Sequence, residues 1–450
     1  MPRKPQLYTG PLWRAFLVFL LPLIGQNILQ SLAMTINSIV VGQMLGTQAL
    51  AAIATFMPVA FFFIAFLIGI TAGSSVLVGQ AWGAQKVDLV RAIAGTTLAA
   101  TLALGVTIGG LGALGAGPLL RLLGTPTDVM PQALSYARAA FASMPVLFMF
   151  IAAASLLRGM GDSVRPLVVQ LISTVVAALL TVSMVMHFHM GVAAAALSTA
   201  VAQAAGLGAL AWWLRRAGHP LAPTRNLGRV LRPDPALLRS VLRIGMPTGV
   251  QLVVGSMAGL VIIGLVNKYG SDATAAYGAV TQVQNYAQFP ALSISIAASI
   301  FGAQAIGAGQ PQLLRAVVRT ALVMNLALTG GLVALIYLFS RNLVSLFITD
   351  AQVIELAQHL LHIVSWSALL FGAGTIFSGI MRSSGTVIPP TIISIASILL
   401  VELPVAWLLS QRIGLEGIWW GYVASFGALT VMQGAYYWLV WRRRPIRALI

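Results

Sequence analysis

Long apolar stretches fill almost the whole chain from residue 13 to residue 441, and only short polar segments separate them. About 20 mostly apolar residues are enough to cross a bilayer as a helix. Only 8% of the residues are charged, whereas a soluble globular domain carries roughly 25%, so too few charges are present to cover a water-facing surface. The sequence therefore predicts an all-α polytopic membrane protein.

The apolar stretches divide into about twelve spans of this length, six in each half of the chain. The predicted spans cover residues 13–42, 48–78, 92–117, 132–157, 166–186, 191–214, 239–267, 273–305, 316–340, 355–380, 388–411 and 416–441. We expect an N-terminal six-helix lobe at residues 1–214 and a C-terminal six-helix lobe at residues 239–450. The polar, basic segment at residues 215–238 is expected to be a cytoplasmic linker between them.

The two halves of the chain repeat each other. Arg158 and Pro166 recur as Arg382 and Pro390, an offset of 224 residues (382 − 158). An even number of spans in each half gives both lobes the same orientation, so we expect a pseudo-twofold axis along the membrane normal. Transporters are commonly built from such repeats, with the substrate path where the repeats meet.

A proline interrupts the first span of each half, at Pro22 and at Pro247. Proline removes a backbone donor and kinks a helix. In lipid the freed carbonyl needs a partner, so such sites face protein or a cavity. The kinks could serve packing alone, but their matched placement favours two mechanical hinges.

Lysine and arginine are shared unequally between the loops on the two sides of the membrane. One side is expected to carry only Arg121, Arg138, Lys268, Arg341 and Arg412, and the other side carries the rest together with both termini. The rich side is predicted to be cytoplasmic. We therefore expect a bacterial-type inner (plasma) membrane protein with both ends inside, and we expect a monomer.

The net charge of +17 does not indicate a nucleic-acid partner. The basic clusters flank apolar spans and are not interleaved with stacking aromatics, which favours contact with anionic lipid. The chain has no cysteine, so disulfides and thiolate metal sites are excluded. The first apolar run, Leu17 to Val41, is too long for the core of a signal peptide and is expected to remain as a helix.

Three groups of short motifs recur in order at matched spacing. The first runs from Pro22 through Val41-Gly42 and Leu45-Gly46 to the segment Gly79-Gln80-Ala81-Trp82-Gly83-Ala84. The second is Arg158-Gly159-Met160-Gly161-Asp162 followed by Pro166. The third repeats the first as Pro247, Tyr269-Gly270, Ala275-Ala276-Tyr277-Gly278 and the segment from Gly302 to Gly309. Together these motifs resemble the multidrug and toxic compound extrusion (MATE) family over nearly the whole chain.

The resemblance implies two six-helix bundles around a V-shaped central cavity. It implies a secondary transporter, not an enzyme, that exports bulky and often cationic organic compounds in exchange for protons or sodium. No cofactor is implied beyond the ion gradient, and the partners implied are a small-molecule substrate and the lipid bilayer.

The chain departs from the family at the positions of its coupling acids. An aspartate in the first span is replaced by Asn37, a glutamate after the second-half proline by Gly255, and a further aspartate by Phe371. Asn37 cannot titrate. It could coordinate a cation or bind substrate, or it could only hydrogen-bond a neighbouring helix.

Glu402 is the one acid of nine that is placed deep in a predicted span. It lies ten residues (412 − 402) from Arg412 at the span end, which is about 15 Å and close to mid-bilayer. An ionised carboxylate there is costly, so such residues are usually functional. We take Glu402 as the coupling-ion residue, with a neutral carboxyl held by its neighbours as the alternative.

Amides and a tyrosine in otherwise apolar spans are the candidates for the substrate cavity. Buried amides need partners, so they should turn toward a wet cavity or toward other helices. The candidates are Gln26 and Gln30 in the first span, Gln251 in the seventh, and Gln282, Gln284 and Tyr286 in the eighth. No metal site is expected, because no carboxylate or cysteine is expected to support the pair His359 and His362.

A flippase of a lipid-linked precursor is the alternative function. Binding a pyrophosphate inside a cavity requires buried cations, and no Lys or Arg lies deep in a predicted span, which favours the exporter. A membrane enzyme would need a second catalytic group at the depth of Glu402, and a receptor would not need two matched kinks.

Overall fold

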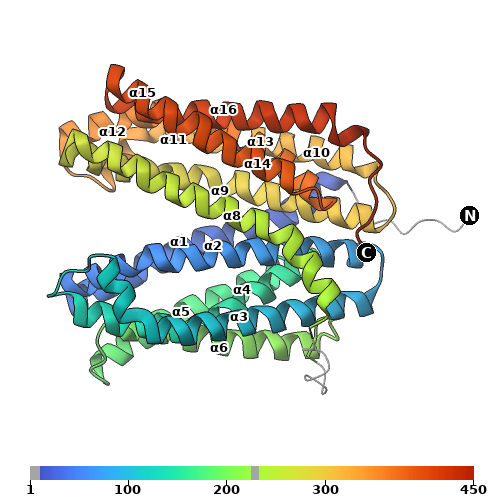
Figure 1. Ribbon diagram of the computed structural model, residues 1–450, viewed down its shortest axis with the longest axis horizontal. Helices are drawn as coiled ribbons and strands as arrows, with labels where there is room; N and C mark the ends of the chain where they lie inside the picture. Colours follow the sequence, from blue (N-terminus) through green and yellow to red (C-terminus); the bar gives the residue numbers. More distant parts are fainter. Residues whose placement is uncertain (1–10, 224–232) are drawn as a thin grey trace, which may run out of the picture. The chain divides into compact units, whose positions relative to one another are not determined.

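The computed structural model describes residues 11–223 and 233–450, and those residues are almost entirely helical (Figure 1). The helices of the first half are α1 (Leu12–Leu45), α2 (Thr47–Gly83), α3 (Val87–Leu122), α4 (Met130–Gly159), α5 (Val164–Met186) and α6 (Ala193–Arg216). Those of the second half are α8 (Pro235–Val266), α9 (Ser271–Gly307), α10 (Leu313–Met324), α11 (Gly330–Ser345), α12 (Ala351–Val364), α13 (Ser367–Ser383), α14 (Ile388–Ala396), α15 (Leu403–Ile413) and α16 (Leu415–Leu439).

Short segments of other helical types join some of these helices. Two are 3₁₀ turns, η1 (Asn267–Tyr269) and η4 (Trp441–Arg443). Two are π-helical segments, η2 (Asn325–Thr329) and η3 (Ser397–Glu402), which continue α10 into α11 and α14 into α15. Part of the predicted linker, residues 224–232, lies outside the described residues.

Ten helices among the described residues are long and apolar enough to cross a membrane. The pair α12 and α13, bent by 41° at its break, would make an eleventh span. The 25-residue helix α16 is not among them. It has the length to span a bilayer and corresponds to the last predicted span.

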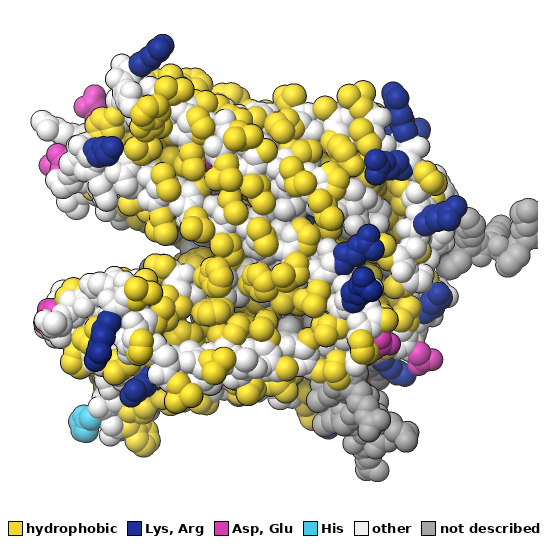
Figure 2. All heavy atoms as spheres, in the orientation of Figure 1, with side chains coloured by type: hydrophobic (Ala, Val, Ile, Leu, Met, Phe, Trp, Pro, Cys, Tyr) yellow, Lys and Arg dark blue, Asp and Glu magenta, His cyan; other side chains and the backbone are white. Residues whose placement is uncertain are grey.

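The outer surface is that of a membrane protein. Large apolar side chains stand exposed on many helices, including Leu114 at 82%, Leu338 at 75% and Leu400 at 73%. Figure 2 shows that in each half hydrophobic side chains cover the middle of the face drawn, while charged side chains gather toward the ends of the helices. An apolar surface of this extent needs lipid around it.

Packing divides the chain into two compact units. One consists of Met1–Leu20 with Pro247–Ile450, and the other of Leu21–Met246. The chain passes from one unit to the other at two places, and both lie inside a helix. One is one residue before Pro22 in α1, and the other is directly before Pro247 in α8.

Close backbone contacts hold α3 and α4 together in the unit Leu21–Met246. A Cβ atom on Gly105 would lie 2.7 Å from Pro145 Cα, and one on Gly109 would lie 2.6 Å from the Phe141 carbonyl oxygen. Lipid provides no hydrophobic drive for helices to associate, so small residues that permit close van der Waals contact take that role. Beside this contact, the Phe56 and Phe141 rings meet edge to face at 5.0 Å.

The other unit has an aromatic core between α9 and α16. Trp419 is 2% exposed, and its ring lies 5.2 Å from Tyr277 and 5.6 Å from Tyr422. Apolar side chains from α8, α11, α12 and α15 pack around these rings. Leu403, the residue after Glu402, packs against this core.

Two glycines begin matching helices with left-handed backbones. Gly46 precedes α2 with φ 82°, and Gly270 precedes α9 with φ 93°. Residues with a Cβ rarely adopt this conformation, which explains why glycine stands at both positions of the repeat.

Candidate ion-coupling site

Glu402 lies where the π-helical segment η3 ends and α15 begins. Pro404, at the start of α15, has no N–H to donate to the preceding turn. A widened turn accommodates such a missing donor, and π-helical turns are frequent at functional sites. The side chain of Glu402 is buried, with 6% of its surface exposed.

Three hydroxyls lie in the neighbourhood of the Glu402 carboxyl. Ser425, on α16, lies beside the carboxyl, and its hydroxyl donates to the backbone carbonyl of Ser397 at 3.1 Å. Tyr277 on α9 and Tyr422 on α16 are close enough to interact electrostatically with Glu402, and their hydroxyls are 3.0 Å apart. We call Glu402, Ser425, Tyr277 and Tyr422 the acid cluster.

The acid cluster suits a carboxyl that holds a proton. When Glu402 is protonated, its O–H can donate to the Ser425 hydroxyl, which in turn donates to the Ser397 carbonyl. When Glu402 is ionised, the Ser425 proton must turn toward the carboxylate. In the described part of the chain Glu402 has no ion pair that would stabilise its charge. An uncompensated buried charge is costly, so loading and release of a proton is the chemistry this arrangement allows.

Unsatisfied polar atoms extend from the acid cluster along α9. Gln284 follows Tyr277 by two turns on the same helix face. Its side chain is 5% exposed, and neither of its amide atoms has a hydrogen-bond partner within residues 11–223 and 233–450. The buried Trp419 Nε1, on α16, also has no hydrogen-bond partner among the described residues. Buried polar atoms are normally paired with protein or with ordered water, so this face of α9 is suited to hold water.

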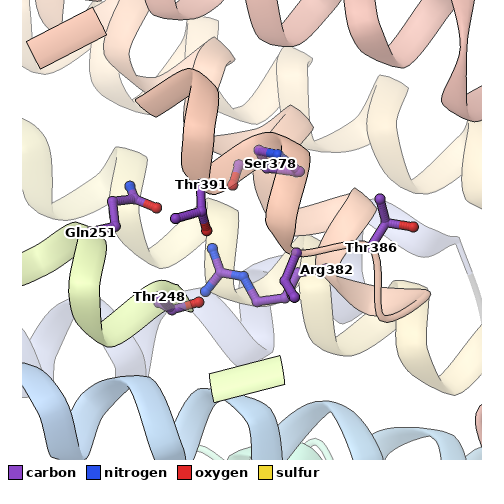
Figure 3. Close-up of a pocket in the computed structure, with 8 residues that line it drawn as sticks. Thr248, Gln251, Ser378, Arg382, Thr386 and Thr391 are labelled. Carbon is purple, nitrogen blue, oxygen red and sulfur yellow. The ribbon is translucent and has the colours of Figure 1, made fainter. Parts of the chain in front are cut away.

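The other amides predicted for the second half are less buried. Gln282 and Tyr286 on α9 are partly buried, and the Tyr286 ring lies 5.5 Å from Phe289. Gln251 on α8 is partly buried and lines a narrow cleft with Arg382 (Figure 3).

The residues predicted in the first span belong to the other unit. Gln26 is 8% exposed and is hydrogen-bonded through both amide atoms: its Nε2 donates to the Ser163 carbonyl at 2.9 Å, and Arg158 donates to its Oε1 at 3.1 Å. Gln30 is exposed and Asn37 is partly buried.

Three members of the acid cluster were not predicted as site residues. Tyr277 lies in a segment that the repeat marks, and a tyrosine hydroxyl in an apolar span is itself a signal. Tyr422 carries the same signal but lies outside the repeated motifs, and Ser425 carries none, because serine is ordinary in a membrane helix and its distance from Glu402 depends on the packing of α15 against α16. Among the described residues no three His, Asp or Glu side chains lie together as a metal site would require.

Comparison with known proteins agrees with the duplication. The family model MatE matches residues 22–183 and again residues 247–408, and the two matches begin at Pro22 and Pro247. The probable multidrug resistance protein YoeA of Bacillus subtilis is 42% identical over 444 residues, which cover 97% of this chain and 96% of that protein. The FAD transporter of Shewanella oneidensis is 26% identical over 424 residues, covering 92% and 91% of the two chains.

Solved structures show the same fold. The crystal structure of a mutant of the Vibrio cholerae MATE transporter VcmN has a TM-score of 0.88 at 20% identity and covers 97% of this chain and 98% of that chain. The outward-facing conformation of a MATE family transporter of the MOP superfamily has a TM-score of 0.87 at 22% identity and covers 98% of both chains. The predicted all-α fold with two six-helix lobes is confirmed. Since the family model covers most of both halves, the chain belongs to the MatE family and is a multi-pass membrane transporter, not an enzyme.

Proposed function

We propose that the protein exports bulky organic compounds, many of them cationic, in exchange for protons that bind at Glu402. The names of its relatives refer to multidrug resistance, multidrug export and FAD transport, which are all movements of organic molecules. The observation that carries the coupling proposal is the acid cluster, in which the one buried acid of the described residues lies near three hydroxyls.

Proton exchange at Glu402 requires that water reach the acid cluster in at least one state of the transport cycle. The unpartnered amide of Gln284, on the same face of α9 as Tyr277, supports such a route. A proton taken up from outside would neutralise Glu402, and its release inside would restore the charge. The change in charge supplies the free energy difference that a moving transporter needs between its states.

Pro22 and Pro247 are proposed as the hinges of that movement. The boundary between the two compact units lies within one residue of each proline. Helices α1 and α8 therefore pass from one unit to the other where the proline has no N–H for the helical hydrogen bonds. Bending at these positions would change the arrangement of whole units while the packing inside each is preserved.

Asn37, Gln26, Gln30, Gln251, Gln282, Gln284 and Tyr286 remain the residues proposed for the cation and substrate path. Gln284 is favoured among them, because both its amide atoms are buried without partners in the described chain. Asn37 is proposed to contribute a neutral oxygen or amide where related proteins have an acid. We place the protein in a bacterial-type inner membrane as a monomer, with both termini in the cytoplasm and lobes at residues 1–214 and 239–450.

Dye efflux from proteoliposomes tests the proposal. The purified full chain is reconstituted, loaded with a fluorescent organic cation, and exposed separately to a pH gradient and to a sodium gradient. We expect the pH gradient to drive efflux and the sodium gradient at equal pH to have no effect. Efflux driven by the sodium gradient alone would show that sodium, not the proton, is the coupling ion. The absence of efflux under both gradients would refute the proposal of an antiporter.

A further inference from the structure

A narrow cleft in the C-terminal unit is lined by a cation and several hydroxyls. Thr248 and Gln251 come from α8, Ser378 and Arg382 from α13, and Thr391 from α14. Figure 3 shows the Arg382 side chain extending from α13 toward Thr248 and Thr391. The cleft leaves about 170 Å³ of empty space even when its open mouth is included, whereas pockets that enclose drug-sized molecules have roughly 300–1,000 Å³. The cleft is therefore too small for a substrate-sized molecule, and only a small group that reaches its open mouth could bind there.

Thr386 also lines the cleft and shares a hydrogen bond with Ser384, but four other polar side chains there have no partners in the described chain. Thr248, Ser378 and Thr391 are 8%, 7% and 8% exposed, and their hydroxyls make no hydrogen bond within the described residues. Arg382 is partly buried, and its guanidinium likewise makes no ion pair or hydrogen bond there. A guanidinium and three buried hydroxyls facing one space without partners point to a ligand rich in oxygen.

The N-terminal half of the chain contains the repeat copy of this arginine and glutamine, which can be compared with the cleft. Arg158 occupies the place of Arg382 in the repeat, and Gln26 the place of Gln251. There the arginine donates to the glutamine oxygen at 3.1 Å, so both side chains are satisfied within the protein. In the C-terminal half the corresponding Arg382 and Gln251 side chains are not hydrogen-bonded to each other in the described structure.

Most of the polar differences between the two copies add a hydroxyl to the C-terminal cleft, although Val387 there stands where the N-terminal copy has Ser163. Three positions that are apolar in the N-terminal half carry hydroxyls in the C-terminal half. The pairs are Leu23 and Thr248, Ala154 and Ser378, and Leu167 and Thr391. Leu167 packs at 3.5 Å from the position of a Cβ on Gly25, so the apolar copy fills space next to its helix.

A carboxylate has also been lost from the second copy. Asp162, four residues after Arg158, forms an ion pair with Arg165. The corresponding residues are Thr386 and Pro389, so the C-terminal copy lacks this acid near its arginine. An anion entering the C-terminal cleft would therefore meet a positive charge without a competing carboxylate.

We propose that this cleft binds a phosphate group through the Arg382 guanidinium and the hydroxyls of Thr248, Ser378 and Thr391. A guanidinium presents paired N–H donors that match the oxygens of phosphate, and hydroxyls can donate to the remaining oxygens. Because α13 ends on the side predicted to be cytoplasmic, the phosphate would come from an anionic lipid headgroup of the inner leaflet or from a soluble cytoplasmic phosphate. The site is distinct from the acid cluster and does not depend on the coupling ion.

Two measurements on the purified full chain distinguish the two sources. In a non-ionic detergent, thermal unfolding is followed during titration with sodium phosphate, with sodium chloride at matched ionic strength as the reference. In lipid nanodiscs, native mass spectrometry counts retained phosphatidylglycerol against phosphatidylcholine. Arg382→Gln removes the cation, and Thr248→Leu/Ser378→Ala/Thr391→Leu installs the side chains of the N-terminal copy. Arg341→Gln removes an exposed positive charge elsewhere and serves as the matched control.

We expect phosphate or phosphatidylglycerol to bind the wild type and the Arg341→Gln variant, and to bind the two cleft variants about tenfold more weakly or less. If inorganic phosphate stabilises the wild type and not the cleft variants, the ligand is a soluble phosphate. If the cleft variants retain less phosphatidylglycerol than the wild type, the ligand is a lipid headgroup. Arg382→Lys keeps the charge without the paired donors, so this variant should bind phosphate or phosphatidylglycerol at an intermediate level. It tests the cleft even if Arg382→Gln folds poorly. Equal binding in wild type and cleft variants, or binding by none, would overturn the proposal.

Discussion

The hydroxyls of Tyr277 and Tyr422 lie 3.0 Å apart and connect α9 to α16 beside Glu402. The contact joins two helices that are distant in sequence, and it places two hydroxyls close to the one buried acid of the described residues. If Glu402 changes its charge as proposed, the change would act on the packing between α9 and α16. Through this contact, proton binding can be linked to the position of whole helices.

Replacing Glu402 by glutamine removes the titratable group and keeps its size. We expect efflux driven by a pH gradient to fall at least about tenfold, with stability within about 1 kcal/mol of the wild type, since a neutral amide replaces a neutral carboxyl. Proteoliposome efflux and thermal unfolding measure the two effects. Glu355→Gln, which alters an exposed carboxylate of the same unit, is the control. Near-normal efflux in Glu402→Gln would exclude the residue from coupling.

Removing either hydroxyl of the tyrosine pair breaks the hydrogen bond between the two side chains. We expect Tyr277→Phe and Tyr422→Phe each to reduce the free energy of unfolding by about 1 kcal/mol. The double variant should lose less than the two single losses together, because both act on the same bond. Tyr436→Phe removes a hydroxyl that has no hydrogen bond within the described residues and is the control. Strict additivity in the unfolding data would show that the two hydroxyls do not interact.

Substituting the interrupting prolines tests the hinge proposal. Pro22→Ala or Pro247→Ala restores a backbone donor and should stiffen the helix between the two units. We expect several-fold slower turnover in the efflux assay with substrate binding retained, because the change affects a conformational step. Pro58→Ala, inside α2 and within a single unit, provides the comparison. Unchanged turnover in both hinge variants would assign these prolines to packing.

A side chain at Gly73 would collide with the start of α8. A Cβ there would lie 2.5 Å from the Val241 carbonyl oxygen and 2.9 Å from the Gly245 nitrogen, and backbone atoms cannot rotate away. We expect Gly73→Leu to reduce the free energy of unfolding by about 1–3 kcal/mol. Gly110→Leu, at a position with open space around the Cβ, should have little effect. Thermal unfolding in detergent compares the two, and equal stability would contradict the close approach of α2 and α8.

His219, in the segment after α6, reports on local charge outside the spans. Burial lowers its pKa below the ordinary 6.5, the positive charge of Arg165 lowers the pKa further, and Asp162 opposes both. The neutral ring accepts a hydrogen bond from the Leu221 amide at Nδ1. The neutral His219 ring therefore contributes fully to the free energy of unfolding above its ordinary pKa. This contribution is lost as the pH falls through the lowered pKa of the folded state.

An NMR titration of the His219 imidazole tests this direction. We expect a midpoint below 6.5, and a still lower midpoint in Asp162→Asn, which removes the one charge that raises the pKa. Asp88→Asn, which neutralises an exposed acid paired with Arg91, is the matched control. A midpoint at or above 6.5 would show that the segment is more open than described.

The sequence by itself determined the class, the family and the duplication. Span length and apolar content depend on composition within a few tens of residues, and the repeat of Arg158 and Pro166 as Arg382 and Pro390 needs no structure. Glu402 could be singled out because a lone acid in a long apolar stretch is visible in one dimension.

Only the tertiary structure decided which groups meet. The neighbours of Glu402 come from α9 and α16, and their distances depend on how those helices pack against the widened turn before Pro404. No local pattern distinguishes Gln26, whose amide is fully hydrogen-bonded, from Gln284, whose amide has no partner in the described chain. Hydrogen bonds between helices join residues far apart in sequence, so the same side chain can be satisfied in one copy of the repeat and available in the other.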